Sequence, residues 1–219
     1  MSVHTLLQCP LFRQIEPEEL SAILRCLNAR EACFPKGSFL PISEESVPLM
    51  GVVLDGSVAM LSEDRGGKRS LLTILWQDQL FGETYACARA KNRIITFQAR
   101  TDCRVLLMNY DRVLHSCKVT CLFHHRLVEN MVELIAAKNL ELTEKIEAVS
   151  CTTIREKVLT YLRRLSQSQD SPRVTVPFGR SELADYLCVD RSAMTRELAH
   201  MREAGLLDYH KREFILLDE

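Results

Sequence analysis

The sequence lacks the features that mark membrane proteins, secreted proteins and proteins that coat nucleic acid. It has no run of 18 or more apolar residues, so no membrane-spanning helix is expected. Residues 1–20 lack the basic segment followed by an apolar core that defines a signal peptide. The formal net charge is −1, so any specific binding of nucleic acid must use positive charge confined to a small part of the surface. We therefore expect a cytoplasmic globular protein.

Catalytic motifs are missing as well. The sequence contains no Walker loop, no nucleophile elbow and no zinc-hydrolase motif, so we predict that the protein is not an enzyme. Nine cysteines are present, and in the cytoplasm we expect most of them to be reduced thiols. Cys9, Cys26 and Cys33 lie too far apart to resemble the closely spaced thiolates that hold an iron–sulfur cluster.

Residues 178–218 have the pattern of two short helices followed by a hairpin. Ser181 can cap the first helix, and after a three-residue turn Asp190 can cap a second helix over residues 191–203. Gly205 lies where a left-handed helix C-cap is expected. Two strand-like runs joined by a basic tip follow it. This succession is typical of a winged helix-turn-helix.

The second of these helices carries polar side chains opposite a narrow apolar stripe. A guanidinium can donate two hydrogen bonds to guanine in the major groove, and hydroxyls can serve bases or phosphates. The alternative is a solvated face whose arginines pair with Glu197 and Asp190. Because the capped helices, the turn and the hairpin occur together, we favour DNA recognition. The predicted DNA-contacting residues are Arg180, Ser181, Arg191, Ser192, Thr195, Arg196, Lys211 and Arg212.

Residues 31–110 show short apolar runs that alternate with turn residues. Strands at about ten-residue spacing, separated by glycine turns, favour an antiparallel roll or barrel. Residues 1–30 instead show apolar residues at helical spacing, which predicts short packing helices. The strand candidates are residues 52–54, 58–61, 71–75, 94–97 and 105–108.

Residues 117–149 predict one long helix, since they contain no proline or glycine. At 1.5 Å per residue, thirty residues of it would span about 45 Å, too long for one small domain to cover. Its apolar stripe is therefore either a coiled-coil seam with a second copy or buried between the chain's own domains. Lys138 and Asn139 interrupt the stripe, which suits a seam of modest stability. The stripe consists of Leu127, Met131, Leu134, Leu142, Ile146 and Val149, widened by Val128 and Ile135.

Together these segments resemble the Crp/Fnr family of bacterial transcription regulators. The C-terminal motif carries the likeness, and residues 53–58 and 80–83 resemble the glycine-centred turns of the family's cyclic-nucleotide-binding roll. The resemblance implies an α+β fold: an antiparallel β-roll of the double-stranded β-helix or jelly-roll type, a long central dimerisation helix and a C-terminal winged helix-turn-helix. It implies an effector-sensing roll with N-terminal helices at 1–116, the dimerisation helix at 117–149 and the DNA-binding domain at 150–219.

The resemblance also implies a mode of action. A homodimer would read a palindromic operator in double-stranded DNA, with half-sites about one helical turn, roughly 34 Å, apart. RNA polymerase is implied as a candidate partner. Carried over by position, Arg191, Ser192 and Arg196 become the base-contacting residues. Ser192 stands where the family commonly has a glutamate, so the preferred operator need not be the one typical of the family.

A small-molecule effector is implied too, with candidate contacts at Gly82, Glu83, Thr84, Arg93 and Thr143. The helix after the Gly-Glu pair would cradle a phosphate with its backbone N–H groups, and Arg93 would neutralise that phosphate. However, Ile94 replaces the usual phosphate-binding hydroxyl residue, and Leu142 replaces one of two hydroxyls that face the purine. We therefore expect an effector other than cyclic AMP, or none. The simpler reading of Gly82 and Glu83 is a turn of the roll without a ligand.

Two other functions stay open at this point. Cys117 and Cys121 share a helix face, and His124 and His125 follow one turn later, which would suit a redox, haem or metal sensor of the same fold. Pairs at helical spacing also arise by chance, and cysteine is a common small buried residue, so we predict no metal site. A cyclic-nucleotide module that acts on a protein partner is the other alternative, and the C-terminal motif argues against it.

Overall fold

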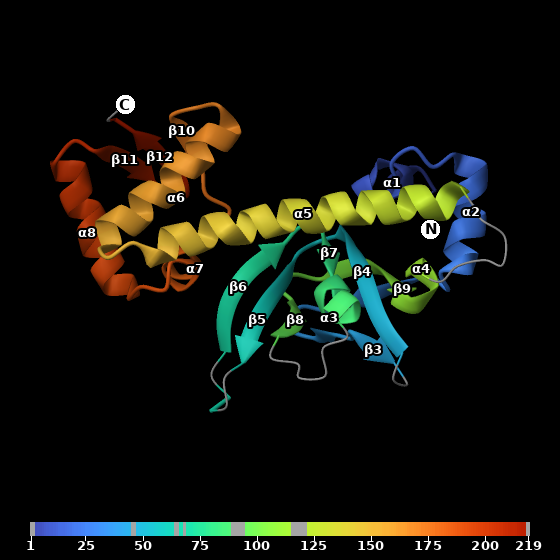
Figure 1. The fold of residues 1–219 in the computed structure, drawn as a ribbon. Helices are drawn as coiled ribbons and strands as arrows, with labels where there is room; N and C mark the ends of the chain where they lie inside the picture. Colours follow the sequence, from blue (N-terminus) through green and yellow to red (C-terminus); the bar gives the residue numbers. More distant parts are fainter. Residues whose placement is uncertain are drawn as a thin grey trace. The chain divides into compact units, whose positions relative to one another are not determined.

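The computed structural model describes residues 3–44, 47–63, 66–67, 69–88, 95–114 and 122–217. Its packing divides the chain into two compact units, residues 1–137 and 138–219, and the division falls inside one long helix. Figure 1 shows the course of the chain through the two units. The three segments proposed from the sequence, which follow function rather than packing, stay a prediction.

The first unit begins with α1 (Val3–Gln8), the 3-10 helix η1 (Pro10–Phe12) and α2 (Pro17–Cys26). A proline opens α2, where the first backbone N–H of a helix has no intrahelical partner in any case. The Glu16 backbone N–H donates to Glu19 Oε2 at 3.0 Å and closes a capping box at the same end. The helices expected in this region are confirmed, and α2 buries Leu20, Ile23 and Leu24.

Two antiparallel sheets form a roll in the first unit. One has the strand order β1–β9–β4–β3, with β7 also paired to β4, and the other has the order β2–β8–β5–β6. Every strand candidate falls on one of these strands, apart from Ile94, which lies outside the described residues. The strands are β1 (Arg30–Phe34), β2 (Phe39–Leu40), β3 (Ser43–Glu44), β4 (Val47–Asp55), β5 (Val58–Glu63), β6 (Arg69–Leu75), β7 (Leu80–Phe81), β8 (Ile95–Ala99) and β9 (Cys103–Asn109).

The interior of the roll is apolar and closely packed. The rings of Phe81 and Phe97 lie 5.6 Å apart between their centroids, within a cluster of buried β-branched and aliphatic side chains. At the turn between β4 and β5, Gly56 has φ +80°, and a Cβ there would lie 2.4 Å from the Asp102 carbonyl oxygen. Only glycine fits that turn. Two short helices complete the unit, α3 (Glu83–Ala88) and α4 (Tyr110–Leu114).

The long helix is α5 (Leu122–Ser150), which confirms the described part of the helix predicted over residues 117–149. Its first half is fastened to the N-terminal segment. The buried Asn130 side chain donates to the carbonyl oxygens of Leu11 at 3.1 Å and Arg13 at 2.9 Å. Arg126 donates to the Gln14 carbonyl oxygen at 2.8 Å. These bonds orient one face of α5 toward the core of its own unit.

The apolar stripe predicted for this helix proves to be two stripes. Leu127 and Met131 are buried in the core of the first unit. A second row, one residue further along, is exposed or half-buried, and we call it the outer stripe. Val132, Leu142 and Ile146 in that row keep 57%, 37% and 63% of their surface exposed. The outer stripe consists of His125, Val128, Val132, Ile135, Asn139, Leu142, Ile146 and Val149.

The second unit contains the end of α5 and a winged helix-turn-helix, as predicted. After α5 come α6 (Ile154–Gln169), α7 (Arg180–Tyr186) and α8 (Arg191–Glu203). Thr153 caps α6, where its hydroxyl accepts from the Glu156 backbone N–H at 3.2 Å. A three-stranded antiparallel sheet has the order β10–β12–β11. Its strands are β10 (Arg173–Thr175), β11 (Leu207–His210) and β12 (Glu213–Leu216).

One predicted cap is wrong. The helix α7 begins at Arg180, so Ser181 lies inside its first turn and Gly179 is the N-cap. The Glu182 carboxylate accepts from the Gly179 backbone N–H at 2.8 Å. Because this carboxylate satisfies the start of the helix, no serine side chain is needed there. Ser181 is left exposed on the surface of α7.

Candidate nucleic-acid interface

The start of α8 is held in a defined position. Asp190 caps the helix, with its carboxylate accepting from the Ala193 backbone N–H at 2.8 Å, as predicted. Cys188 makes the preceding turn with a left-handed backbone, φ +55°. Met194, Leu198 and Met201 have no exposed surface and fix the inner face of the helix. Gly205, at φ +73°, follows the end of the helix, as predicted.

The outer face of α8 presents polar side chains to solvent. Arg191, Ser192, Thr195 and Arg196 are all exposed. Thr195 donates its hydroxyl proton to the Arg191 carbonyl oxygen at 2.8 Å, so toward a ligand this side chain is an acceptor.

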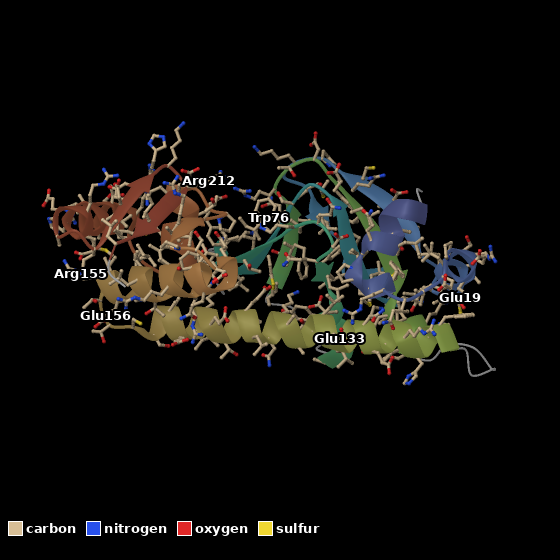
Figure 2. The ribbon with its side chains drawn as sticks, turned by 90° about the horizontal axis from the view of Figure 1, so that it is seen from above. Glu19, Trp76, Glu133, Arg155, Glu156 and Arg212 are labelled. Carbon is tan, nitrogen blue, oxygen red and sulfur yellow. The ribbon has the colours of Figure 1, made fainter. Side chains whose placement is uncertain are left out.

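The carboxylates that could neutralise this face have other partners. Glu197 lies 2.7 Å from Arg155 Nε of α6, and Asp190 is the helix cap. Arg155 is labelled in Figure 2 at the start of α6. In the part of the chain that the structure describes, the Glu197 and Asp190 carboxylates therefore have partners other than Arg191 and Arg196, and both arginines reach solvent.

The wing is the hairpin of β11 and β12. Lys211 at its tip has a left-handed backbone, φ +55°, and both Lys211 and Arg212 are exposed. Arg212, labelled in Figure 2, also accepts at its carbonyl oxygen from the Val176 backbone N–H at 2.8 Å. The tip thus has a backbone held by a hydrogen bond and two exposed cationic side chains, which suits contact with phosphates.

Arg180 was predicted to contact DNA, but its side chain lies against the wing. Its guanidinium carbon is 4.8 Å from the ring centroid of Tyr209 and 5.2 Å from that of Phe214. Its Nη2 donates to the Lys211 carbonyl oxygen at 3.4 Å. Burial lowers the pKa of Arg180, which is the expected sign for a cation partly withdrawn from water.

A second arginine, Arg202, supports the same tyrosine and was missed in the sequence. Its guanidinium carbon lies 3.9 Å from the centroid of the Tyr209 ring, and its Nε is 2.7 Å from Asp208 Oδ1. It also donates to the Tyr209 carbonyl oxygen. The pairing of α8 with β11 could be anticipated only from the short separation of Arg202 and Tyr209 in the chain.

The end of α5 is attached to the DNA-binding motif by contacts that the sequence did not reveal. The Lys145 ammonium lies 4.2 Å from the ring centroid of Tyr186 on α7, and Glu147 pairs with Arg164 of α6 at 2.7 Å. Burial lowers the pKa of Lys145 and raises that of Tyr186 to about 12. A small cavity of about 80 Å³ lies beside them. This lysine and tyrosine link the last turns of α5 to the helix-turn-helix.

The predicted effector residues are only partly within the described chain. Gly82 has φ +79°, and a Cβ there would lie 2.7 Å from the Leu49 carbonyl oxygen. Glu83 is buried and accepts from the Thr84 hydroxyl at 3.0 Å. Arg93 and Ile94 lie outside the described residues. Thr143, on α5, is exposed and donates to the Asn139 carbonyl oxygen at 2.9 Å.

A hollow of about 470 Å³ on the roll lies elsewhere, beside the start of β9. Asp55 and Asp102 contribute carboxylates to its lining, and Arg104, which also lines it, pairs with Glu31 at 3.0 Å. Its acidic lining does not suit an anionic nucleotide. The hollow and the Gly82 turn are therefore separate features of the roll.

The proposed cysteine and histidine cluster is only partly described. Cys117 and Cys121 lie outside the described residues. His124 is buried, and burial lowers its pKa, whereas His125 is exposed with its Nε2 3.3 Å from Glu129. Within the described ranges, no three histidine, cysteine, aspartate or glutamate side chains come together in a metal-binding arrangement. Of the helices traced there, none is both long and apolar enough to cross a membrane.

Comparison with known proteins agrees with this arrangement. Residues 31–118 match a model of the cyclic nucleotide-binding domain, and residues 156–219 match one of the Crp-like helix-turn-helix domain. The cAMP-activated global transcriptional regulator CRP of Salmonella typhimurium is 24% identical over 190 residues, covering 84% of this chain and 87% of that protein. The probable transcriptional regulator flp of Lacticaseibacillus casei is 25% identical over 211 residues, covering 95% and 92%.

A solved structure with the same fold is that of the c-di-GMP responsive global regulator CLP of Xanthomonas campestris. Its TM-score is 0.67 at 16% identity, and the match covers 91% of this chain and 100% of that one. A cyclic-nucleotide-binding-like roll followed by a winged helix-turn-helix defines a DNA-binding transcription regulator with a sensing domain. The chain belongs to the Crp/Fnr family of such regulators.

Proposed function

We propose that the protein acts as a homodimer that binds a palindromic operator in double-stranded DNA. The observation that carries the proposal is the exposed face of α8, where Arg191 and Arg196 reach solvent while Glu197 pairs with Arg155 and Asp190 caps the helix. Each copy inserts the start of α8 into the major groove, where guanidinium groups read guanine. Arg191, Ser192 and Arg196 face the bases. The Thr195 hydroxyl accepts a hydrogen bond from a donor group of a nearby base. Phosphates are contacted by Ser181, Lys211 and Arg212.

Arg180 has a different role in this proposal. Its contacts with Tyr209, Phe214 and the Lys211 carbonyl oxygen suit a residue that positions the wing. It acts on DNA through the wing tip, and its charge adds to the local positive potential.

The residue at 192 shapes which operator is preferred. A carboxylate at this position would accept from the amino group of cytosine, and it would discriminate strongly against other bases. The Ser192 hydroxyl is short and both donates and accepts. We therefore expect weaker discrimination at the base pair that Ser192 faces than at those faced by Arg191 and Arg196.

Dimerisation would use the outer stripe of α5, whose exposed Val132, Leu142 and Ile146 are otherwise left in water. Two copies related by a two-fold axis would place their α8 helices at half-sites about one helical turn, roughly 34 Å, apart. The protein acts by binding rather than by catalysis, and RNA polymerase is the partner through which binding would change transcription.

The roll senses a small molecule other than cyclic AMP in this proposal. Ile94 and Leu142 supply no hydroxyl where the family resemblance implies ligand hydrogen bonds. One relative is described as cAMP-activated and a structural neighbour as c-di-GMP responsive, so the fold accommodates more than one effector.

The test is operator binding by single variants. A duplex is selected from a random library with the intact protein, and affinities are measured by fluorescence anisotropy at several salt concentrations. Arg191→Ala and Arg196→Ala should each lose about 1–3 kcal/mol on the selected duplex and discriminate less against base changes. Lys211→Ala should lower the affinity for all DNA sequences alike, and it should reduce the slope of log affinity against log salt concentration by about 1.

The matched control is Arg163→Ala, because Arg163 is an exposed arginine on α6 and belongs to neither α8 nor the wing hairpin. It should leave affinity and sequence preference unchanged. Retention of wild-type affinity and preference by both α8 variants would contradict the groove assignment.

A further inference from the structure

The outer stripe of α5 keeps a strict alternation of three and four residues. Its eight members follow one another at intervals 3, 4, 3, 4, 3, 4 and 3 from His125 to Val149. An uninterrupted 3–4 alternation over this length is the repeat of a two-helix coiled coil, because it keeps one row of side chains facing a partner helix. The a positions are His125, Val132, Asn139 and Ile146, and the d positions are Val128, Ile135, Leu142 and Val149.

The occupant that fits this row is a second copy of the same helix. Asn139 is a polar residue at a single a position, a device that specifies the register and the number of strands of a coiled coil. The β-branched Val132 and Ile146 at two other a positions are compatible with a pair. Five members of the row are exposed, and Val132 and Ile146 keep more than half of their surface exposed. The other three are half-buried, and of these Val128 and Ile135 also pack against the core of the first unit. Lys138, at a flanking g position, would face Thr143 of the partner helix, and Lys145 is held on the Tyr186 ring of its own chain, so no like charges oppose one another in a parallel pair.

Asn139 breaks the apolar character of the row at its third a position. It is exposed, and its neighbours in the row are Ile135 and Leu142. Covering an amide with apolar side chains leaves its donors and acceptor without partners, which is destabilising. In a parallel, in-register pair each a residue meets its own copy, so the two Asn139 amides can bond to each other. In an antiparallel pair, a positions meet d positions, and Asn139 would meet Ile135 or Leu142.

We infer that Asn139 selects the parallel, in-register pairing of two α5 helices by hydrogen bonding to its own copy. The inference rests on the dimer proposed above and adds what fixes its orientation and register. Parallel pairing places the C-terminal, DNA-binding ends of both chains at the same end of the coiled coil. Asn139 therefore lowers the stability of the coiled coil, and it also fixes the orientation in which both DNA-binding domains can bind one palindromic operator.

Subunit mixing tests whether Asn139 meets its own copy. Affinity-tagged wild-type protein is mixed with untagged Asn139→Leu, the subunits are allowed to exchange, and the heterodimer fraction is measured after capture on the tag. Random exchange of equal amounts gives half heterodimer. Because an amide facing leucine is unpaired, we expect the exchange equilibrium constant to fall about a hundredfold, which leaves under about a tenth as heterodimer.

Two controls separate this effect from a general change in the seam. Ile146→Val keeps a β-branched residue at an a position, and Leu140→Gln changes a side chain outside the row that is 66% exposed. Each should mix with wild type at random. Asn139→Val should repeat the exclusion seen with Asn139→Leu, which guards against an effect peculiar to leucine.

The outcomes distinguish the two proposals. Exclusion of both Asn139 variants from wild-type dimers supports the inference. Random mixing of Asn139→Leu with wild type, in a protein that is otherwise a dimer, overturns the inference and leaves the dimer standing. A wild-type protein that sediments as a single chain at micromolar concentration overturns the dimer and this inference with it.

Discussion

Gly82 and Gly67 have the same left-handed φ of +79° and differ in the described residues around them. A Cβ on Gly82 would lie 2.7 Å from the Leu49 carbonyl oxygen, whereas a Cβ on Gly67 would meet no described residue within 4 Å. An L-residue at such a φ is strained by roughly 1–2 kcal/mol at either position. At Gly82 the steric clash with the Leu49 carbonyl adds to this strain energy, because a carbonyl in a sheet cannot move aside.

This pair of glycines gives a prediction at the residue scale. Gly67→Ala should lower the free energy of unfolding of the roll by about 1–2 kcal/mol, and Gly82→Ala by about 3 kcal/mol or more, because overpacking adds to the strain. Trp76, the single tryptophan, lies in the roll and reports its unfolding in urea by fluorescence (Figure 2). Equal losses in the two variants would mean that the turn relaxes freely, and that Gly82 is not held by packing.

Single residues show how far the sequence alone can lead. The exposure of Arg191, Ser192 and Arg196 follows from helical periodicity and was correctly predicted. The stacking of Arg180 on Tyr209 was not, because it joins residues far apart in the chain and depends on where the wing folds back. Composition and spacing predict that a cationic side chain such as Arg180 lies at the surface. They do not predict that it packs against the wing of its own domain.

At the scale of the element, local chemistry defined α8 and its surroundings. Asp190 at one end and Gly205 beyond the other gave the bounds Arg191–Glu203 correctly, since both signals act within a few residues. The start of α7 was placed too late, because Ser181 and the Glu182 carboxylate offer competing ways to begin a helix. The stripe of α5 read as one row, because residues buried by the chain's own core and residues left outside are both apolar.

The wing gives a prediction at this scale. Arg180→Ala removes the contacts with Tyr209 and the Lys211 carbonyl oxygen, and a partly buried cation–π contact contributes roughly 1–2 kcal/mol. Amide exchange over residues 207–216 of the free protein should therefore become about tenfold faster, as measured by mass spectrometry. The neighbouring exposed Ser181→Ala should leave exchange unchanged. If Arg180→Ala lowered DNA affinity while exchange in the hairpin stayed at the wild-type rate, Arg180 would contact phosphate directly.

At the scale of the whole molecule, the proposed pairing of two chains would present two recognition helices to the two halves of a palindrome. Ile146→Glu places two like charges face to face in the outer stripe, so it should shift the protein from dimer to monomer in sedimentation equilibrium at micromolar concentration. Its affinity for a full operator should then fall to that for a single half-site.

Leu140→Glu is the control for that variant. Leu140 lies on the same helix, is 66% exposed and stands outside the outer stripe, so an added charge there should leave the dimer intact. Dissociation by both variants would point to a general effect of charge on α5 and against the assigned seam.

The amide of Asn139 has a consequence for a cell that contains several regulators of this architecture. In the inferred pairing it determines partner specificity. A related chain with valine or leucine at the equivalent position would form heterodimers poorly, even when the rest of its helix matches. After a gene duplication, a single substitution at this position of α5 would thus stop the two gene products from forming heterodimers. Each product would then act as a separate homodimer while both still bound the same DNA sequence.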